Sequence, residues 1–228
     1  MINKKYIYLS VIFVFLIIIK FINPPIIQFS PPRTGRTLLW NILRHAVPQR
    51  RVLKTHYLKA KYLKESNKVK IIISVRDPVD SISSSIQRYS QVPTDDLVVD
   101  HIKRFECHGI WQVLEVKDYS NVTILRYEDF AFDWAYLFES LETSLGCVIN
   151  QDVRRMSFTN YGIEVVAQKA KELGDFGNID SKDQIHGKHI SNFKGRVGHG
   201  RENLSPKQID LINESFRPYS EAFGYLDL

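Results

Sequence analysis

The sequence has few cysteines and no pattern of metal ligands. Its 228 residues include only Cys107 and Cys147, which make neither a disulfide framework nor a metal-binding spacing. We therefore expect two separate thiols in the core. Dense runs of lysine or arginine are also missing, although the formal net charge is +6. This mildly basic balance favours an anionic ligand or a membrane surface over nucleic acid.

Long hydrophobic runs are missing except at the N-terminus. Residues 6–22 are apolar apart from Ser10 and Lys20, and a run of this length is just sufficient to cross a bilayer as a helix. No small-residue cleavage site follows, which favours a retained anchor over a cleaved signal peptide. We expect a single-pass membrane protein with an anchor over residues 1–24 and one folded domain over residues 25–228. Basic residues flank the run on both sides, so its orientation stays open.

Apolar runs alternate with helical patterns along the rest of the chain. Short β-rich runs predict strands within residues 26–30, 51–56, 69–75 and 121–130. Helical periodicity is found over residues 37–46, 77–89, 94–118, 133–146 and 205–216. This alternation predicts an α/β fold with a parallel sheet and right-handed crossovers. Residues 159–203 have little apolar periodicity and predict a long loop, which in a compact domain is often a lid or binding loop.

The first predicted strand and helix are joined by a small basic loop. Residues 30–44 read SPPRTGRTLLWNILR. A strand, a tight glycine loop and a helix start direct backbone N–H groups and the helix dipole at one point, which suits an anion. Arg33, Thr34, Arg36 and Thr37 add charges and hydroxyl donors, so phosphate or sulfate is the expected ligand. The loop lacks the spaced glycines and the Gly-Lys-Ser/Thr ending of a Walker A motif.

Three further polar segments accompany this loop. The first is KTH at residues 54–56, at the end of a predicted strand, where parallel sheets bind ligands. The second is SVRDPVDSISSS at residues 74–85, in which an arginine and serine hydroxyls surround a helix start and suggest a second phosphate site. The third is FKGRVGHGRE at residues 193–202, which is basic and rich in glycine. Each segment alone is also typical of structural positions: a buried histidine, a solvated helix face and a flexible linker.

Taken in order, five segments resemble the sulfotransferases that use 3′-phosphoadenosine-5′-phosphosulfate (PAPS). They are PPRTGRTLLW, KTH, VRDPVDSISSS, LRYEDF and FKGRVGHGRENLSPKQ, and the resemblance extends from residue 26 to the C-terminus. It implies a three-layer P-loop-like fold with a central parallel sheet flanked by helices. It also implies transfer of a sulfuryl group from PAPS, as co-substrate and without a metal, to a hydroxyl or amine acceptor.

The resemblance also implies residue roles. His56 matches the catalytic base, Lys54 its neighbour at the sulfuryl group, and Arg33 the cation that faces the leaving oxygen. The residues that match cofactor-binding positions are Arg33, Thr34, Gly35, Arg36 and Thr37 at the 5′-phosphosulfate, Leu38, Tyr127 and Phe158 near the adenine, and Arg76, Asp80, Ser84, Lys194 and Gly195 at or near the 3′-phosphate.

Three positions depart from the family pattern. Arg36 replaces a small hydroxyl residue, and Leu38 stands where cytosolic members often have tryptophan. Phe193 replaces the arginine that usually precedes Lys194 and Gly195, and Arg196 is a candidate to compensate for it.

These departures keep two alternatives open: a P-loop-like small-molecule kinase and a non-catalytic nucleotide-binding membrane protein. The anchor favours a glycan, a lipid-linked molecule or a protein side chain as acceptor. It implies the Golgi lumen in a eukaryote or the cytoplasmic membrane face in a bacterium. The oligomeric state is left open.

Overall fold

The computed structural model describes residues 24–60, 62, 68–89 and 91–226. The predicted membrane anchor over residues 6–22 lies outside this part of the chain. Within the described residues, none of the helices combines the length and the apolar character that a membrane span needs.

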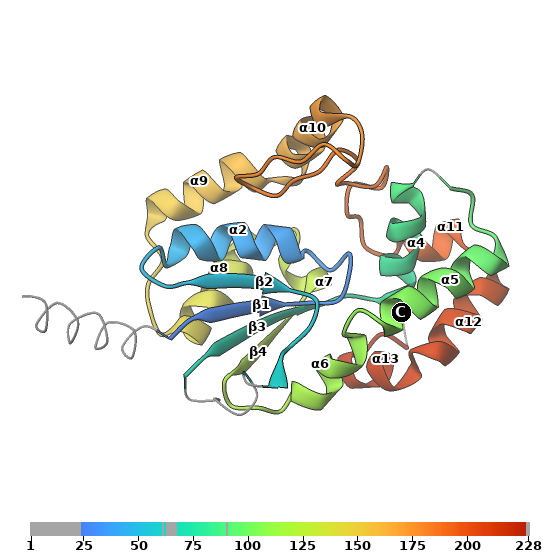
Figure 1. The fold of residues 1–228 in the computed structure, drawn as a ribbon, viewed down its shortest axis with the longest axis horizontal. Coiled ribbons are helices and arrows are strands. Elements are labelled where there is room, and N and C mark those ends of the chain that lie inside the picture. Colours follow the sequence, from blue (N-terminus) through green and yellow to red (C-terminus); the bar gives the residue numbers. More distant parts are fainter. Residues whose placement is uncertain (1–23, 61, 63–67, 90, 227–228) are drawn as a thin grey trace, which may run out of the picture.

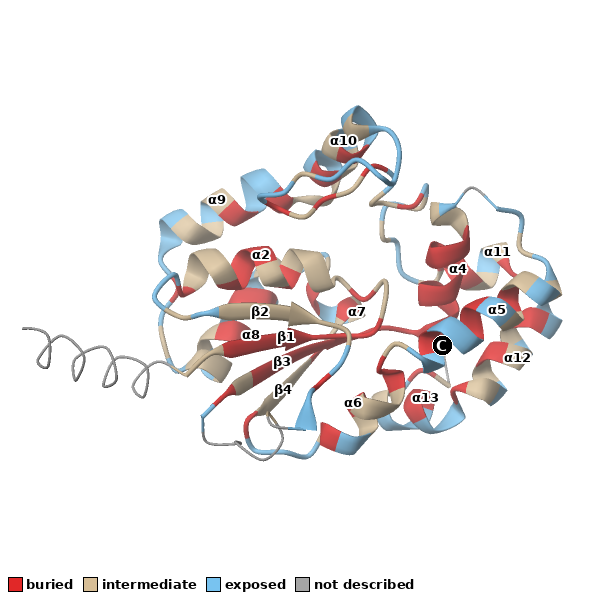
Figure 2. Cartoon of the chain, in the orientation of Figure 1, coloured by how far each residue is buried: buried red, intermediate tan, exposed pale blue. Residues whose placement is uncertain are grey.

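Four parallel strands form the centre of the fold (Figure 1). They are β1 (Ile26–Phe29), β2 (Val52–Thr55), β3 (Lys70–Val75) and β4 (Val122–Arg126). The order across the sheet is β2-β1-β3-β4, and every neighbouring pair is parallel. The predicted α/β class with a parallel sheet is confirmed. In β1 and β3 both faces of the strand are buried, as Figure 2 shows, which explains why these strands read as continuous apolar runs.

Two hydrophobic clusters cover the two faces of the sheet, so the domain has three layers. Ile26 and Ile72 belong to one cluster, and their neighbours Ile27 and Ile71 belong to the other, because side chains alternate along a strand. The first cluster is completed by α2 (Arg36–Ala46), α7 (Tyr127–Phe130), α8 (Trp134–Leu145), α9 (Gln151–Tyr161) and α10 (Ile163–Leu173). The second is completed by α4 (Pro78–Arg88), α5 (Asp95–Glu106), α6 (Ile110–Val116), α12 (Pro206–Ser215) and α13 (Arg217–Phe223), while the short α11 (His199–Asn203) packs on α4.

Several local signals in the sequence have the expected structural role. The Asp77 side chain caps α4 by accepting the backbone N–H of Val79, and Pro78 occupies the first helical turn. Ser205 and Gln208 form the predicted capping box of α12.

Three sequence-based expectations are wrong. Residues 94–118 form two helices because Gly109 adopts a left-handed backbone with φ of +77°. Residues 159–203 contain the end of α9 and the helices α10 and α11 as well as loop. The apolar residues of α10 follow a helical spacing from Ile163 to Leu173, so the signal for this helix is present in the sequence. Cys107 is an exposed free thiol and lies outside the core.

Candidate active site

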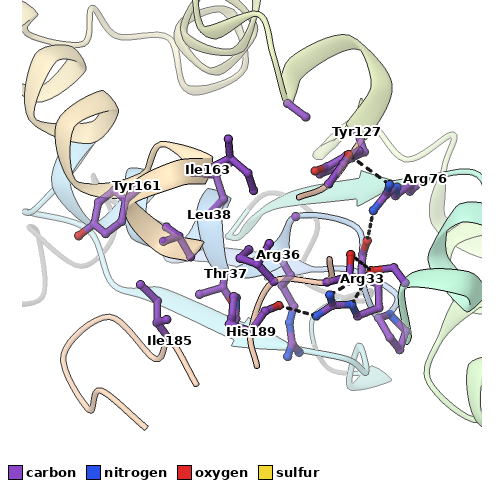
Figure 3. Close-up of a pocket in the computed structure, with 18 of the residues that line it drawn as sticks. Arg33, Arg36, Thr37, Leu38, Arg76, Tyr127, Tyr161, Ile163, Ile185 and His189 are labelled. Atoms are coloured by element: carbon purple, nitrogen blue, oxygen red, sulfur yellow. Dashed lines mark hydrogen bonds between the residues drawn. The ribbon is translucent and has the colours of Figure 1, made fainter. Parts of the chain in front are cut away.

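A cavity of about 330 Å³ lies at the carboxyl ends of the strands (Figure 3). The loop after β1, the end of β2, helix α4 and the segment from Ile185 to Gly195 contribute to its wall. Eleven of the sequence-predicted site residues line it: Arg33, Gly35, Arg36, Thr37, Leu38, Lys54, His56, Arg76, Ser84, Tyr127 and Gly195. The fold therefore brings together residues as distant in the sequence as Arg33 and Gly195, which are 162 positions apart.

The loop after β1 turns sharply against α7. Gly35 has a left-handed backbone with φ of +84°, and a Cβ there would lie 3.0 Å from the ring of Phe130, so any other residue would strain the loop at this position. Thr34 is buried and does not line the cavity: its hydroxyl contacts the backbone oxygen of Pro31 at 2.9 Å and the hydroxyl of Ser74 at 3.1 Å. The Thr34 side chain thus stabilises the loop and does not face a ligand.

The Arg33 guanidinium lies beside Ser84. Its Nε and Nη2 donate to Ser84 Oγ at 3.1 Å and 3.0 Å, and its Nη1 donates to the backbone oxygen of His189 at 2.8 Å. Arg33 itself has a left-handed backbone with φ of +64°, which is uncommon outside glycine. Arg33, which the resemblance assigns to the leaving oxygen, is thus hydrogen-bonded to Ser84, which the resemblance assigns to the 3′-phosphate.

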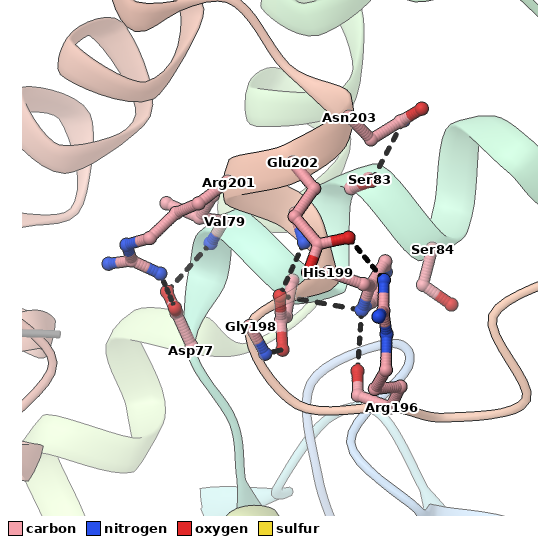
Figure 4. Close-up of polar contacts among 12 residues, drawn as sticks. Asp77, Val79, Ser83, Ser84, Arg196, Gly198, His199, Arg201, Glu202 and Asn203 are labelled. Carbon is pink, nitrogen blue, oxygen red and sulfur yellow. Dashed lines mark hydrogen bonds and ion pairs between the residues drawn. The ribbon is translucent and has the colours of Figure 1, made fainter.

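Arg76, just before α4, and Asp80, on α4, hold the loop before α11 (residues 193–198). Figure 4 shows Arg196 and Gly198 of this loop beside the helix that carries Ser83 and Ser84. Arg76 donates to the backbone oxygens of Gly195 at 3.3 Å and Arg196 at 3.1 Å, and it pairs with Asp80 at 3.4 Å. Asp80 is fully buried and does not line the cavity, and its oxygens accept the backbone N–H groups of Gly198 at 2.8 Å and Gly200 at 2.7 Å. Asp80 therefore holds the glycine-rich loop against the helix that carries Ser84.

His56 and Lys54 lie at the end of β2, on the same wall of the cavity as Arg36. His56 Nδ1 lies 2.9 Å from the backbone oxygen of Ser30. A carbonyl oxygen only accepts, so Nδ1 carries the proton and Nε2 keeps its lone pair. Burial, together with the positive charge of Arg36, lowers the pKa of His56 to about 3. The imidazole is thus neutral at physiological pH, with a free lone pair at Nε2. An anionic ligand that neutralises Arg36 would raise this pKa toward the range that suits a base.

Lys54 is held loosely at the same end of the cavity. Its Nζ lies 3.5 Å from Thr37 Oγ1 and 4.8 Å from the centre of the Trp40 ring. Burial and the nearby charge of Arg36 lower the pKa of Lys54 to about 8, and its ammonium has no carboxylate partner among the described residues.

The cavity has an excess of positive charge. Burial and neighbouring cations lower the pKa of Arg33 to about 9 and that of Arg36 to about 10. Within the part of the chain that the structure describes, no aspartate or glutamate lines the cavity. Cations in a dry site repel one another unless an anion neutralises them. The arrangement therefore fits a ligand with several negative charges, as an adenosine nucleotide with a 3′-phosphate and a 5′-phosphosulfate has.

Besides Thr34 and Asp80, two predicted cofactor residues do not line the cavity. Phe158 is 61% exposed and touches Trp134, with ring centres 5.5 Å apart. Lys194 is exposed and pairs with Glu164 at 2.6 Å. The structure also adds residues that the sequence reasoning missed, namely Arg88, Trp134, Tyr161, Phe176, His186 and His189. Only Arg88 had a sequence signal, because it lies four residues after Ser84 on a predicted helix.

Comparison with known proteins identifies the family. Residues 41–224 match the family model described as the sulfotransferase domain. The chain belongs to the sulfotransferase family. The predicted family and enzyme class are thus confirmed, whereas the roles of individual residues stay predictions. The loop over residues 30–40 precedes the matched range. No curated protein matches this sulfotransferase by sequence.

Solved structures share the fold at low sequence identity. The mouse sulfotransferase SULT7A1, complexed with PAP, has a TM-score of 0.66 and 16% identity, covering 86% of this chain and 84% of that one. A retinol dehydratase in complex with androsterone and the inactive cofactor PAP has a TM-score of 0.61 and 13% identity, covering 86% and 80%. A retinol dehydratase complex with retinol and PAP has a TM-score of 0.58 and 15% identity, covering 87% and 82%. This sulfotransferase therefore has the three-layer fold of these enzymes.

Proposed function

We propose that this sulfotransferase transfers the sulfuryl group of PAPS to a hydroxyl or amine acceptor by in-line displacement, with His56 as the base. PAPS supplies a sulfuryl group whose bond to the 5′-phosphate oxygen breaks as the acceptor atom bonds to sulfur. The observation that carries the proposal is the neutral imidazole of His56 in the cavity wall, with Nδ1 held by Ser30. In this tautomer Nε2 can take the proton of the acceptor hydroxyl.

The cations around His56 have the positions needed to stabilise negative charge. Lys54 lies next to Thr37 at the start of α2, where it would neutralise the sulfuryl oxygens. The loop amides and the N-terminal end of α2 would face the 5′-phosphate, which gains charge as the bond to sulfur breaks. At the other side of the cavity, Arg76 and the Arg33–Ser84 pair would bind the 3′-phosphate.

A membrane anchor over residues 6–22 is also part of the proposal, on the strength of the apolar sequence. Pro24 lies just before the amino end of β1, whereas the cavity lies at the carboxyl ends of the strands. Because β1 has only four residues, an anchor directly before Pro24 would leave the cavity near the bilayer. The acceptor would then be a glycan, a lipid-linked molecule or a protein side chain at the membrane. The enzyme would act in the Golgi lumen of a eukaryote, or at the cytoplasmic face of a bacterial membrane.

The mechanism is tested by measuring how fast the His56→Ala chain transfers the sulfuryl group of ³⁵S-labelled PAPS. Membrane, glycan and protein fractions serve as acceptors for the wild-type enzyme. We expect the variant to lose transfer by at least about 100-fold, because a positioned base contributes roughly 10²–10⁴-fold, while its affinity for PAP stays within about twofold.

Transfer at the wild-type rate would show that His56 is not the base. Nucleotide binding without any transfer by the wild-type enzyme would favour the non-catalytic alternative, and a preference for ATP would favour a kinase.

A further inference from the structure

The loop before α11 brings no side-chain cation to the cavity. Phe193 occupies the position where an arginine is expected, and its ring packs on His199 with centres 4.5 Å apart. Arg196, the candidate to compensate, forms an ion pair with Glu202 and does not line the cavity. Lys194 pairs with Glu164 outside the cavity. Within residues 193–198, only Gly195 lines the cavity, so a further cation for the 3′-phosphate has to come from outside this loop.

Arg88 lies where such a cation is needed. It is on α4, one helical turn after Ser84, so the two side chains share a face of the helix, and both line the cavity. The Arg88 guanidinium packs on the ring of Phe176, 4.1 Å from its centre. Its Nε is buried and has no hydrogen-bond partner among the described residues. A buried donor without a partner is costly, and a ligand oxygen would satisfy it.

The charge of Arg88 acts on Arg33, whose guanidinium is hydrogen-bonded to Ser84. Apart from burial, Arg88 is the largest cause of the lowered pKa of Arg33, and the Arg33 guanidinium is hydrogen-bonded to Ser84 Oγ. Arg33, Ser84 and Arg88 therefore surround one region of the cavity with two guanidinium groups and a hydroxyl. A phosphate dianion is suited to such a region, because it accepts several charge-assisted hydrogen bonds.

Aromatic side chains hold Arg88 in this position. Phe176, under the guanidinium, stacks on His186 with ring centres 4.9 Å apart and planes at 11°. His186 in turn stacks on His189, whose backbone oxygen accepts a hydrogen bond from Arg33. The column fixes the guanidinium by cation–π contact and leaves its N–H edge available.

We propose that Arg88 binds the 3′-phosphate of the cofactor and supplies the guanidinium that Phe193 does not provide. The identity of the ligand rests on the proposed function. The placement of Arg88 in the cavity does not. Since Arg88 comes from α4 and not from the loop, binding of this phosphate depends less on the loop before α11 than the family pattern implies.

Calorimetric titration of the full-length chain in detergent with PAP and with 5′-AMP tests this assignment. Arg88→Ala should weaken PAP binding by about 10- to 100-fold, the effect of losing a hydrogen bond to a charged group, and should leave 5′-AMP binding within about twofold. Arg88→Met keeps the packing on Phe176 without the charge and should give the same loss, which separates the charge from folding. Arg196→Ala is the matched control, with unchanged binding of both nucleotides.

Unchanged PAP affinity in Arg88→Ala and Arg88→Met would overturn the assignment, and so would an equal loss for PAP and 5′-AMP. A loss of PAP affinity confined to Arg196→Ala would show that Arg196, in the loop before α11, supplies the cation instead. A wild-type chain that binds PAP no better than 5′-AMP would instead contradict the proposed function, so the two failures are distinguishable.

Discussion

Replacement of Asp80 by alanine should loosen the loop before α11 and destabilise the whole domain. Asp80 is 0% exposed, and its carboxylate accepts two backbone N–H groups, from Gly198 at 2.8 Å and from Gly200 at 2.7 Å. It also pairs with Arg76 at 3.4 Å. Alanine would leave the buried N–H of Gly200 without an acceptor, at about 1–3 kcal/mol, and would remove the hydrogen bond to the half-buried N–H of Gly198, at about 1 kcal/mol. Arg76 would keep its bonds to backbone oxygens, so little is added by the broken ion pair.

Together these effects give a loss of roughly 2–4 kcal/mol in the free energy of unfolding. Denaturant unfolding measures the loss, and amide hydrogen exchange over residues 193–203 localises it. Asp80→Asn keeps one acceptor oxygen, so it should lose about half as much, roughly 1–2 kcal/mol. The matched control is Asp118→Ala, which breaks only an exposed pair with Lys117 and should cost less than about 1 kcal/mol. An Asp80→Ala chain as stable as the Asp118→Ala chain would refute this account of the loop.

Two further substitutions test the environment of His56. Arg36→Ala should raise the pKa of His56 above its value of about 3, because the nearby positive charge that disfavours the imidazolium is removed; an NMR titration of the apo enzyme that gives an unchanged pKa would contradict the geometry. Gly109→Ala should cost roughly 1–3 kcal/mol and lower turnover, because a Cβ at this position would overlap the backbone oxygen of His56. Gly146→Ala, which has a similar positive φ but open space around it, separates backbone strain from the overlap, and equal effects of the two substitutions would argue against the contact with His56.

The sheet and the main helices could be predicted from the sequence because their signals are local. The run from Lys70 to Val75 is apolar because both faces of β3 are buried, and Asp77 with Pro78 marks the start of α4. The helix α10 has such a local signal too, because its apolar residues follow a helical spacing from Ile163 to Leu173. The break between α5 and α6 has a local signal in Gly109, whereas the close approach of Gly109 to the backbone oxygen of His56, 53 residues away in the sequence, has none.

Site residues could be predicted where the position of a residue at the end of a strand determines that its side chain lies at the cavity. His56 and Arg76 follow the carboxyl ends of β2 and β3, and both line the cavity. The direction of longer side chains was not predictable, since Arg33 turns to Ser84 and Arg196 turns to Glu202 through contacts between distant segments. The packing of Arg88 on Phe176 was likewise not predictable, since it requires α4 and the segment around Phe176 to lie side by side.

The central claim is that the cation-rich cavity binds a 3′-phosphorylated adenosine nucleotide. The most direct measurement is calorimetric titration of the full-length chain with PAP, 5′-AMP and ATP. The account predicts that PAP binds at least about tenfold more tightly than either of the others, since the 3′-phosphate gains charge-assisted hydrogen bonds worth about 1.5–3 kcal/mol. Equal affinity for PAP and 5′-AMP, or tighter binding of ATP, would contradict it.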